Sequence, residues 1–289
     1  MARQPLRIAA AQYDIGYFER IDEYRAKARR WVEEAAGNGA RLLLFPEYAS
    51  MELASLFPRE VQRALPAQLR SMQDLLDDYL GLYAELARTH RVYIQPGTFP
   101  VRLENGQYRN RAYFFHPDGR HEYQEKLQMT RFESERWLID PGEELKVFDT
   151  AFGRVAVSVC YDVEFPLLAR RQVEAGAELI LVPSCTDTLA GYHRVRVGCQ
   201  ARALENQCYV VQSSTVGEAR WSEAVDVNVG AAGIYTPIDY GFPDNGVLAA
   251  GELNRPGWVY GDLDFERVAH VREAGQVFNF RDWTKQLRF

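Results

Sequence analysis

The sequence has few cysteines and no long apolar run. Four cysteines in 289 residues are too few and too scattered for the disulfide framework of a small secreted domain. No stretch approaches the roughly 18 to 20 apolar residues of a membrane-spanning helix. In the opening MARQPLRIAAAQYDI, Gln12 and Asp14 interrupt the apolar residues, which is typical of a first strand and not of a signal peptide. We therefore expect a cytoplasmic protein without a membrane partner.

Positive charge and the common cofactor motifs are also in short supply. The 34 lysines and arginines are outnumbered by 40 aspartates and glutamates, and the net charge of -6 argues against nucleic acid as a partner. No Cys-x-x-Cys or His-Glu-x-x-His spacing predicts a metal site, and the only loop resembling a nucleotide motif, GNGARL, lacks a third glycine. We therefore expect no metal and no cofactor, and a small molecule as the substrate.

The patterns that are present are typical of one layered α/β domain. Apolar residues recur at helical spacing over 18–36, 69–90, 166–175 and 193–206. Short apolar runs predict strands at 6–13, 42–45, 92–97, 179–183, 208–214, 233–236 and 258–263. Two hairpins are expected over 111–125 and 145–160, each with its own turn. A fold in which helices cover β-sheets accommodates this combination of helices, strands and hairpins.

A short aromatic segment ends the chain. We expect a main domain over residues 1–265 and a tail over 266–289, which ends in VFNFRDWTKQLRF. The apolar residues of this tail are costly to leave in water. They are Phe278, Phe280, Trp283, Leu287 and Phe289. The tail therefore covers either an interface with a second copy or the chain's own domain, and the sequence leaves both explanations open.

Three chemically reactive side chains follow predicted strands. LLLFPEY places Glu47 after a buried strand, EYQEKLQ places Lys126 at the end of a hairpin strand, and SVCYDVEFP places Cys160 at the end of another. Functional groups collect at the carboxyl ends of strands in α/β sheets. Each residue alone has an ordinary explanation: a solvated acid, a surface lysine, and a small buried hydrophobe.

Together, the three side chains have the composition of a nucleophilic site. A thiol is mostly protonated at pH 7, so it needs a base, a nearby cation or both before it can attack a carbonyl. Glu47 can supply the base, and Lys126 can supply positive charge for a thiolate or an oxyanion. A Cys-His protease would need an imidazole beside Cys160. His193 is the nearest candidate in sequence, but nothing else in the chain fits a papain-like pattern.

The segments FPEY, EKLQMTRFE and VCYDVEFP, in that order, resemble the nitrilase or carbon–nitrogen hydrolase superfamily. The likeness extends over most of the chain, through AAAQYD, FDTAFGRVAVSVCYD and RALENQCYVVQSS. The resemblance implies a four-layer α-β-β-α sandwich, commonly assembled as a homodimer or a higher homo-oligomer. It also implies a catalytic triad formed by Glu47, Lys126 and Cys160.

The resemblance implies further site residues as well. The family often has a second glutamate after the lysine, and Glu133 is the best match, with Glu135 as the competitor. Tyr161 is expected in the wall of the substrate pocket, with its backbone N–H near the oxyanion, and Asp162 is expected to cap the turn. One departure concerns the substrate. Glu164 stands where many members carry a basic residue, which leaves the substrate class open.

The expected function is hydrolysis of a non-peptide carbon–nitrogen bond through a thioester on the cysteine. Most branches of the superfamily act on amides, ureido compounds or carbamoyl groups, which makes a small compound of this kind the expected substrate. A nitrilase acting on a nitrile and an N-acyltransferase with the same triad are the enzymatic alternatives, since no stretch of the sequence decides between water and an amine as acceptor. The non-enzymatic alternative is a catalytically silent binding protein of the same fold.

Overall fold

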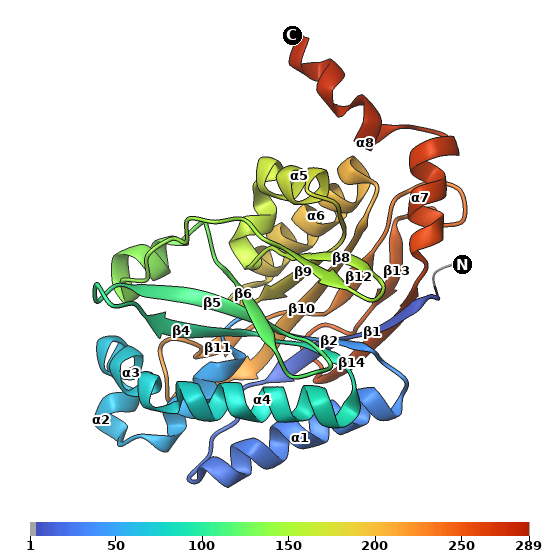
Figure 1. Cartoon of the computed structure of the whole chain (residues 1–289). Helices are drawn as coiled ribbons and strands as arrows, with labels where there is room; N and C mark the ends of the chain where they lie inside the picture. Colours follow the sequence, from blue (N-terminus) through green and yellow to red (C-terminus); the bar gives the residue numbers. More distant parts are fainter. Residues whose placement is uncertain (1–3, 289) are drawn as a thin grey trace.

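The structure, a computed structural model, describes residues 4–288. Within them, fourteen strands form a curled sheet with two halves, seen edge-on in Figure 1. The first half contains β1 (Leu6–Asp14), β2 (Leu42–Phe45), β3 (Tyr93–Pro96), β4 (Thr98–Arg102), β5 (Tyr108–Phe115), β6 (His121–Glu125) and β14 (Gly257–Leu263). The second half contains β7 (Val147–Thr150), β8 (Gly153–Val157), β9 (Ala177–Ser184), β10 (Tyr209–Glu218), β11 (Val227–Asn228), β12 (Gly233–Tyr235) and β13 (Val247–Ala250).

The two halves join where the carboxyl ends of β1 and β10 run parallel. Gln12 pairs with Ser214 there, and Asp14 pairs with Val216. Nearer the start of each strand, the two strands no longer pair with each other: β1 pairs with β14, and β10 pairs with β12. The halves therefore diverge from a shared seam, and the sheet folds into two layers.

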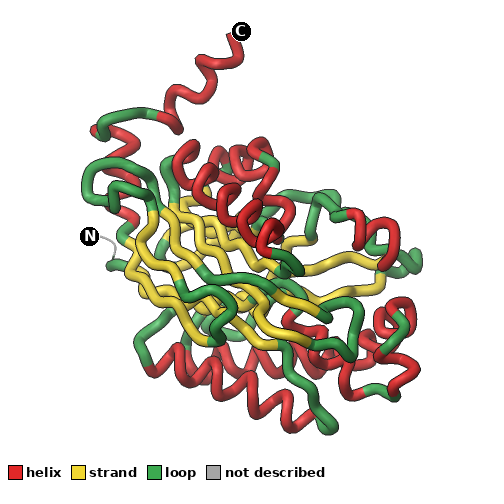
Figure 2. Tube along the Cα trace, turned by 180° about the vertical axis from the view of Figure 1, so that it is seen from behind, coloured by secondary structure: helices red, strands yellow, loops and turns green. Residues whose placement is uncertain are grey.

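Helices cover the outer face of each half, as Figures 1 and 2 show. The helices α1 (Ile21–Gly37) and α4 (Leu76–His90) lie on the first half, and α5 (Pro166–Glu174) and α6 (Leu189–Asn206) lie on the second. Strand β1 is buried on both sides: Ile8 and Ala10 belong to the core that the two halves share, whereas Ala9 and Ala11 face the α1–α4 layer. The expected α-β-β-α sandwich is confirmed.

Shorter helices complete the chain. They are η1 (Ala49–Leu56), α2 (Arg59–Gln62), α3 (Leu65–Met72), η2 (Gln73–Leu75), the π-helix η3 (Phe132–Trp137), η4 (Cys160–Glu164), α7 (Phe265–Ala274), α8 (Asn279–Asp282) and η5 (Trp283–Arg288). None of the helices between residues 4 and 288 combines the length and apolarity needed to cross a bilayer.

The helix predicted over 69–90 is wrong in one respect, because it is broken at 73–75. The break has a tertiary cause. The side chain of Gln73 donates to the carbonyl oxygen of Pro100 at 2.8 Å and accepts from the backbone N–H of Arg102 at 2.8 Å. Gln73 therefore ties the helical segment to β4, and periodicity along the chain carries no signal of that contact.

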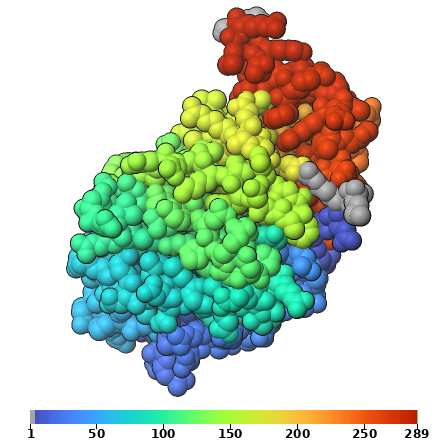
Figure 3. All heavy atoms as spheres, viewed as in Figure 1, coloured from blue at the N-terminus to red at the C-terminus, as the bar shows by residue number. Residues whose placement is uncertain are grey.

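The C-terminal segment begins against the domain and then leaves it (Figures 1 and 3). The ring of Phe280 lies 4.7 Å from the Arg170 guanidinium and 4.4 Å from that of Arg272. Beyond Trp283 the side chains are exposed, with Leu287 at 76%. Phe289 lies outside the described residues. The start of this tail therefore packs on the chain's own domain, and its end does not.

Candidate active site

Cys160 opens a tight turn after β8. The strand ends at Val157, three residues earlier than expected, and Cys160 starts the 3-10 helix η4. Its φ of 48° lies in the left-handed region, which costs a non-glycine residue about 1 to 3 kcal/mol and is often found at functional sites. The side chain is nearly buried, and its thiol donates a weak hydrogen bond to the Cys185 carbonyl oxygen at 3.7 Å.

Asp162 holds this turn in place. Its carboxylate accepts hydrogen bonds from the backbone N–H of Val159 at 3.2 Å, Leu127 at 3.1 Å and Gln128 at 2.7 Å. The expected turn cap is therefore confirmed, and it does more than cap, because it joins the cysteine turn to the loop of Lys126. Burial raises the pKa of Asp162 to about 7, against the opposing effects of Lys126 and the three N–H donors.

Lys126 lies between two buried carboxylates. Its Nζ is 2.8 Å from Oε1 of Glu47 and 2.6 Å from Oε2 of Glu133. All three side chains are at most 3% exposed. Lys126 is therefore not a surface lysine, and Glu47 is not a solvated acid.

Glu133 and not Glu135 contacts the lysine. The Glu133 carboxylate also accepts from the Tyr48 hydroxyl at 2.6 Å and from the Thr130 backbone N–H at 2.9 Å. Glu135 is exposed and pairs with Arg131 on the surface at 2.9 Å. The π-helix explains the difference, because it turns Glu133 inward while Glu135 stays in solvent.

Glu47 reaches toward the cysteine side of the cluster. Its Oε2 accepts the backbone N–H of Cys185 at 3.2 Å, and the Cys160 thiol donates to the carbonyl oxygen of the same residue, so both side chains lie beside Cys185. The side chain of Asn110, on β5, donates to Oε1 of Glu47 at 2.9 Å. Sequence reasoning missed Asn110, because it lies between Arg109 and Arg111 near the start of β5, where a polar residue carries no special signal.

Charge in this enclosed cluster is distributed unevenly. Burial raises the pKa of Glu47, and Lys126 only partly offsets it. For Glu133 the balance is reversed, since burial is outweighed by Lys126 and the pKa is lowered. Burial alone would lower the pKa of Lys126, but both glutamates outweigh it and the pKa lies well above its ordinary value. Burial and Glu47 raise the pKa of Cys160 despite Lys126, so the resting thiol is neutral.

A family comparison decides what kind of protein this is. The family model described as carbon-nitrogen hydrolase matches residues 7–273. The chain belongs to the carbon-nitrogen hydrolase family. The superfamily and the enzyme class expected from the sequence are thereby confirmed.

Individual members of this family differ in how much of their length the chain covers. It is 35% identical over 283 residues to the probable hydrolase YhcX of Bacillus subtilis (strain 168), across 98% of this chain and 54% of that protein. The chain thus spans about half the length of that relative. It is 25% identical over 280 residues to the omega-amidase NIT2 of Homo sapiens, across 94% of this chain and 93% of that protein.

Solved structures of the superfamily share the fold. Nit3 of Saccharomyces cerevisiae superposes with a TM-score of 0.79 at 22% identity, covering 100% of this chain and 98% of that one. An amidase from Nesterenkonia sp. superposes with a TM-score of 0.71 at 22% identity, covering 93% and 94%. These two structures agree with the layer order described above.

The side chains around the buried cluster of this carbon-nitrogen hydrolase are mixed in polarity. Tyr161 is half-buried, and its ring packs edge-on against Phe165 with centroids 4.9 Å apart. Glu164 is also half-buried, and its carboxylate lies 3.6 Å from the Arg194 guanidinium. Burial raises the pKa of Glu164, and Arg194 opposes that rise. A carboxylate with a pairing cation therefore lies one turn after the cysteine.

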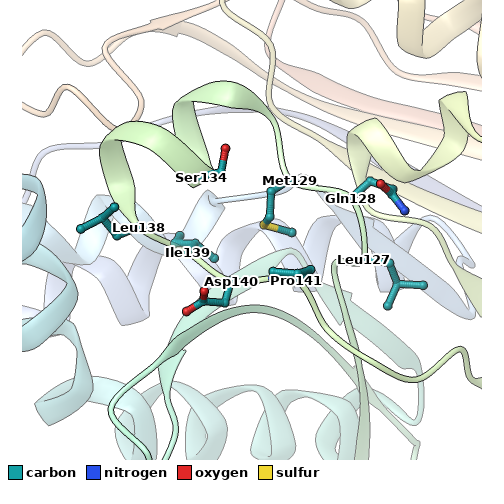
Figure 4. A pocket seen from close by; sticks show the side chains of 8 residues that line it. All are labelled: Leu127, Gln128, Met129, Ser134, Leu138, Ile139, Asp140 and Pro141. Atoms are coloured by element: carbon teal, nitrogen blue, oxygen red, sulfur yellow. The ribbon is translucent and has the colours of Figure 1, made fainter.

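A separate pocket of about 360 Å³ lies on the loop that follows Lys126. Figure 4 shows its lining: Leu127, Gln128, Met129, Ser134, Leu138, Ile139, Asp140 and Pro141. Neither carboxylate of the cluster, nor the lysine, nor the cysteine lines it. The four reactive side chains therefore belong to the buried cluster and not to this pocket.

Proposed function

We propose that this protein hydrolyses the carbon–nitrogen bond of a small amide or ureido/carbamoyl compound through a thioester on Cys160. One observation carries the proposal: a buried Lys126 joined to Glu47 and Glu133, with Glu47 and the Cys160 thiol both hydrogen-bonded to the backbone of Cys185. In this proposal Glu47 is the base and then the acid, Lys126 stabilises the oxyanion, and Glu133 holds Lys126 in position.

The first half-reaction forms the thioester. Glu47 removes the thiol proton as the Cys160 sulfur bonds to the substrate carbonyl carbon. The resulting oxyanion is stabilised by the Lys126 ammonium and the backbone N–H of Tyr161. Glu47 then gives its proton to the nitrogen, the carbon–nitrogen bond breaks, and ammonia or an amine leaves. Because the resting thiol is neutral, the attack requires Glu47 to take up the thiol proton.

The second half-reaction releases the acid. Glu47 takes a proton from a water molecule, the water oxygen bonds to the thioester carbon, and the carbon–sulfur bond breaks as the proton returns to the sulfur. One carboxylate thus serves as acid and base in turn, which is most efficient when its pKa is near the working pH. The raised pKa of Glu47 supports this double role.

Support for an amide comes from the relatives, several of which are named omega-amidases at 25 to 27% identity. Tyr161 is assigned to the wall of the substrate site because it directly follows the cysteine and is half-buried. A nitrile as substrate and an amine as acyl acceptor use the same three side chains, so they are tested together with the amide.

The experiment measures ammonia or amine release from a panel of small amides, ureido acids and nitriles. Cys160→Ala should abolish release, whereas Cys199→Ala, a matched control in the apolar core, should retain it. Turnover that survives in Cys160→Ala would overturn covalent catalysis at this cysteine. Product formed only when an amine acceptor is added would favour the acyltransferase. A panel without any product and without an acyl adduct on Cys160 would favour the silent binding protein.

We also propose that the chain forms a homodimer through the outer face of α5 and α6. Leu167 and Val197 are each 61% exposed and Leu204 is 38% exposed on these neighbouring helices. The apolar tail beside α6 extends the same surface. Sedimentation velocity should show a dimer that Val197→Glu dissociates; a monomeric wild type would refute this assembly.

A further inference from the structure

We propose that Asn110 is a positioning residue that holds Glu47 and Glu133 in one arrangement and leaves Oε2 of Glu47, which has no side-chain donor among the described residues, to accept the thiol proton. Its side-chain nitrogen donates to Oε1 of Glu47 at 2.9 Å and contacts Oε1 of Glu133 at 3.3 Å. Its backbone oxygen accepts the N–H of Lys126 at 2.9 Å. One fully buried residue of β5 thus contacts both carboxylates and the lysine between them.

The orientation of the amide follows from its partners. If it were flipped, its oxygen would face two carboxylate oxygens, and three acceptors would meet without a proton among them. The nitrogen therefore faces Glu47 and Glu133. The amide oxygen, buried in the same place, has no hydrogen-bond partner among the described residues. The amide oxygen gains no hydrogen bond here. The stabilisation that this side chain provides therefore comes from the hydrogen bonds that its nitrogen donates.

The consequence for Glu47 is an asymmetry between its two oxygens. Oε1 accepts from both Lys126 and Asn110, at 2.8 and 2.9 Å. Among residues 4–288, Oε2 accepts only the backbone N–H of Cys185, at the longer distance of 3.2 Å. Oε2 is therefore the more basic oxygen, and it lies on the side of the cluster where the Cys160 thiol donates to the Cys185 carbonyl group. Without Asn110, the carboxylate could rotate, and either oxygen could face the thiol.

The amide also favours the ionised form of Glu47, because a hydrogen bond donated to a carboxylate stabilises its charge. The groups that face this carboxylate come from five segments of the chain. They are Lys126 after β6, Glu133 on the π-helix, Cys160 on η4, Cys185 after β9 and Tyr48 before η1. Only Lys126 among them is a cation, so the amide is the second side-chain donor that keeps Glu47 charged.

The test is the pH dependence of kcat/KM in two variants. Asn110→Leu removes the donor while keeping a side chain branched at the same carbon, and Asn110→Ala removes it without adding bulk, so the proposal can still be tested if one of the two variants fails to fold. Both should move the acidic limb to higher pH by about one unit, because a hydrogen bond to a charged group is lost. We expect kcat to fall about 10- to 100-fold with KM within about threefold, since Asn110 acts through Glu47 and not on the substrate.

Asn206→Leu is the matched control. Asn206 is also fully buried, its side-chain oxygen also lacks a partner among residues 4–288, and its nitrogen donates only to the Arg202 carbonyl oxygen at 3.1 Å on α6. A wild-type pH profile in folded Asn110→Leu would overturn the proposal and reduce Asn110 to packing. An equal shift in Asn206→Leu would overturn it too, because the effect would then be global.

The inference rests on the proposed function, but its failure can be told apart from failure of that function. Iodoacetamide alkylation of Cys160, followed by mass spectrometry against pH, needs no substrate and still requires a proton acceptor for the thiol. If the substrate panel gives no product, the alkylation profile tests Asn110 alone. An upward shift in both Asn110 variants supports the positioning role, and unchanged profiles refute it.

Discussion

Replacing Lys126 by methionine removes the cation that contacts the two buried carboxylates of Glu47 and Glu133. The methionine side chain has a similar length but carries no charge and donates no hydrogen bond. Besides Lys126, the Glu133 carboxylate accepts from four other donors: the Tyr48 hydroxyl, the Asn110 amide, and the backbone N–H and hydroxyl of Thr130. Glu47 has two other donors among the described residues, the Asn110 amide and the Cys185 backbone N–H. Glu47, whose pKa is already raised, is therefore the carboxyl group that takes up a proton in Lys126→Met.

The size and sign of the stability change follow from this uptake. Removing one partner of a buried ion pair costs about 3 to 5 kcal/mol in the free energy of unfolding. A carboxyl whose folded-state pKa is raised contributes its stability at low pH and loses it as the pH rises through that pKa. The deficit of Lys126→Met should therefore be small near pH 5 and approach its full size near pH 8. The rate should fall by at least about 10²- to 10³-fold, the usual cost of one oxyanion donor.

A second buried lysine provides the control. Lys27 Nζ lies 2.9 Å from Oε2 of Glu52, with its side chain 8% exposed, outside the candidate site. Lys27→Met should lose stability of the same order in urea unfolding, yet keep kcat per folded molecule within about threefold. The reasoning would be refuted if Lys126→Met retained the native kcat, or if its loss of stability did not change between pH 5 and pH 8.

Two further predictions each compare two residues of the same type that the sequence alone does not distinguish. Glu133→Gln should lower kcat at least about tenfold, because Lys126 loses a charged partner at 2.6 Å. Glu135→Gln, which changes only a surface ion pair, should leave kcat within about twofold of the native value. Comparable losses of kcat in the two variants would contradict the structure. Gly97→Ala should destabilise the fold by more than about 2 kcal/mol in urea unfolding, because its new Cβ would lie 2.1 Å from the Pro46 carbonyl oxygen just before Glu47. Gly217→Ala, at a similar φ but with open space around it, should cost only about 1 kcal/mol, and equal losses would show that φ alone decides.

Much of the fold was predictable because its cause is local. Strands such as Leu42–Phe45 are buried on both faces and therefore read as continuous apolar runs. The hairpin of β5 and β6 is marked by Pro117-Asp118-Gly119, and Gly119 adopts the positive φ that such a turn requires. The start of α6 was missed by four residues, because Thr188 caps it through Gly191 in a stretch without helical periodicity.

By itself, the order of motifs along the chain determined the family, the layer architecture and the three side chains proposed for catalysis. Only the tertiary structure decided that Glu133 contacts the lysine while Glu135 does not, that Asn110 belongs to the cluster, and which glutamate has the raised pKa. The physical reason is that these properties depend on burial and on distances between segments far apart in sequence. The sequence does not distinguish a glutamate in solvent from a glutamate beside a buried ammonium group, because the difference lies in their surroundings and not in the residue type.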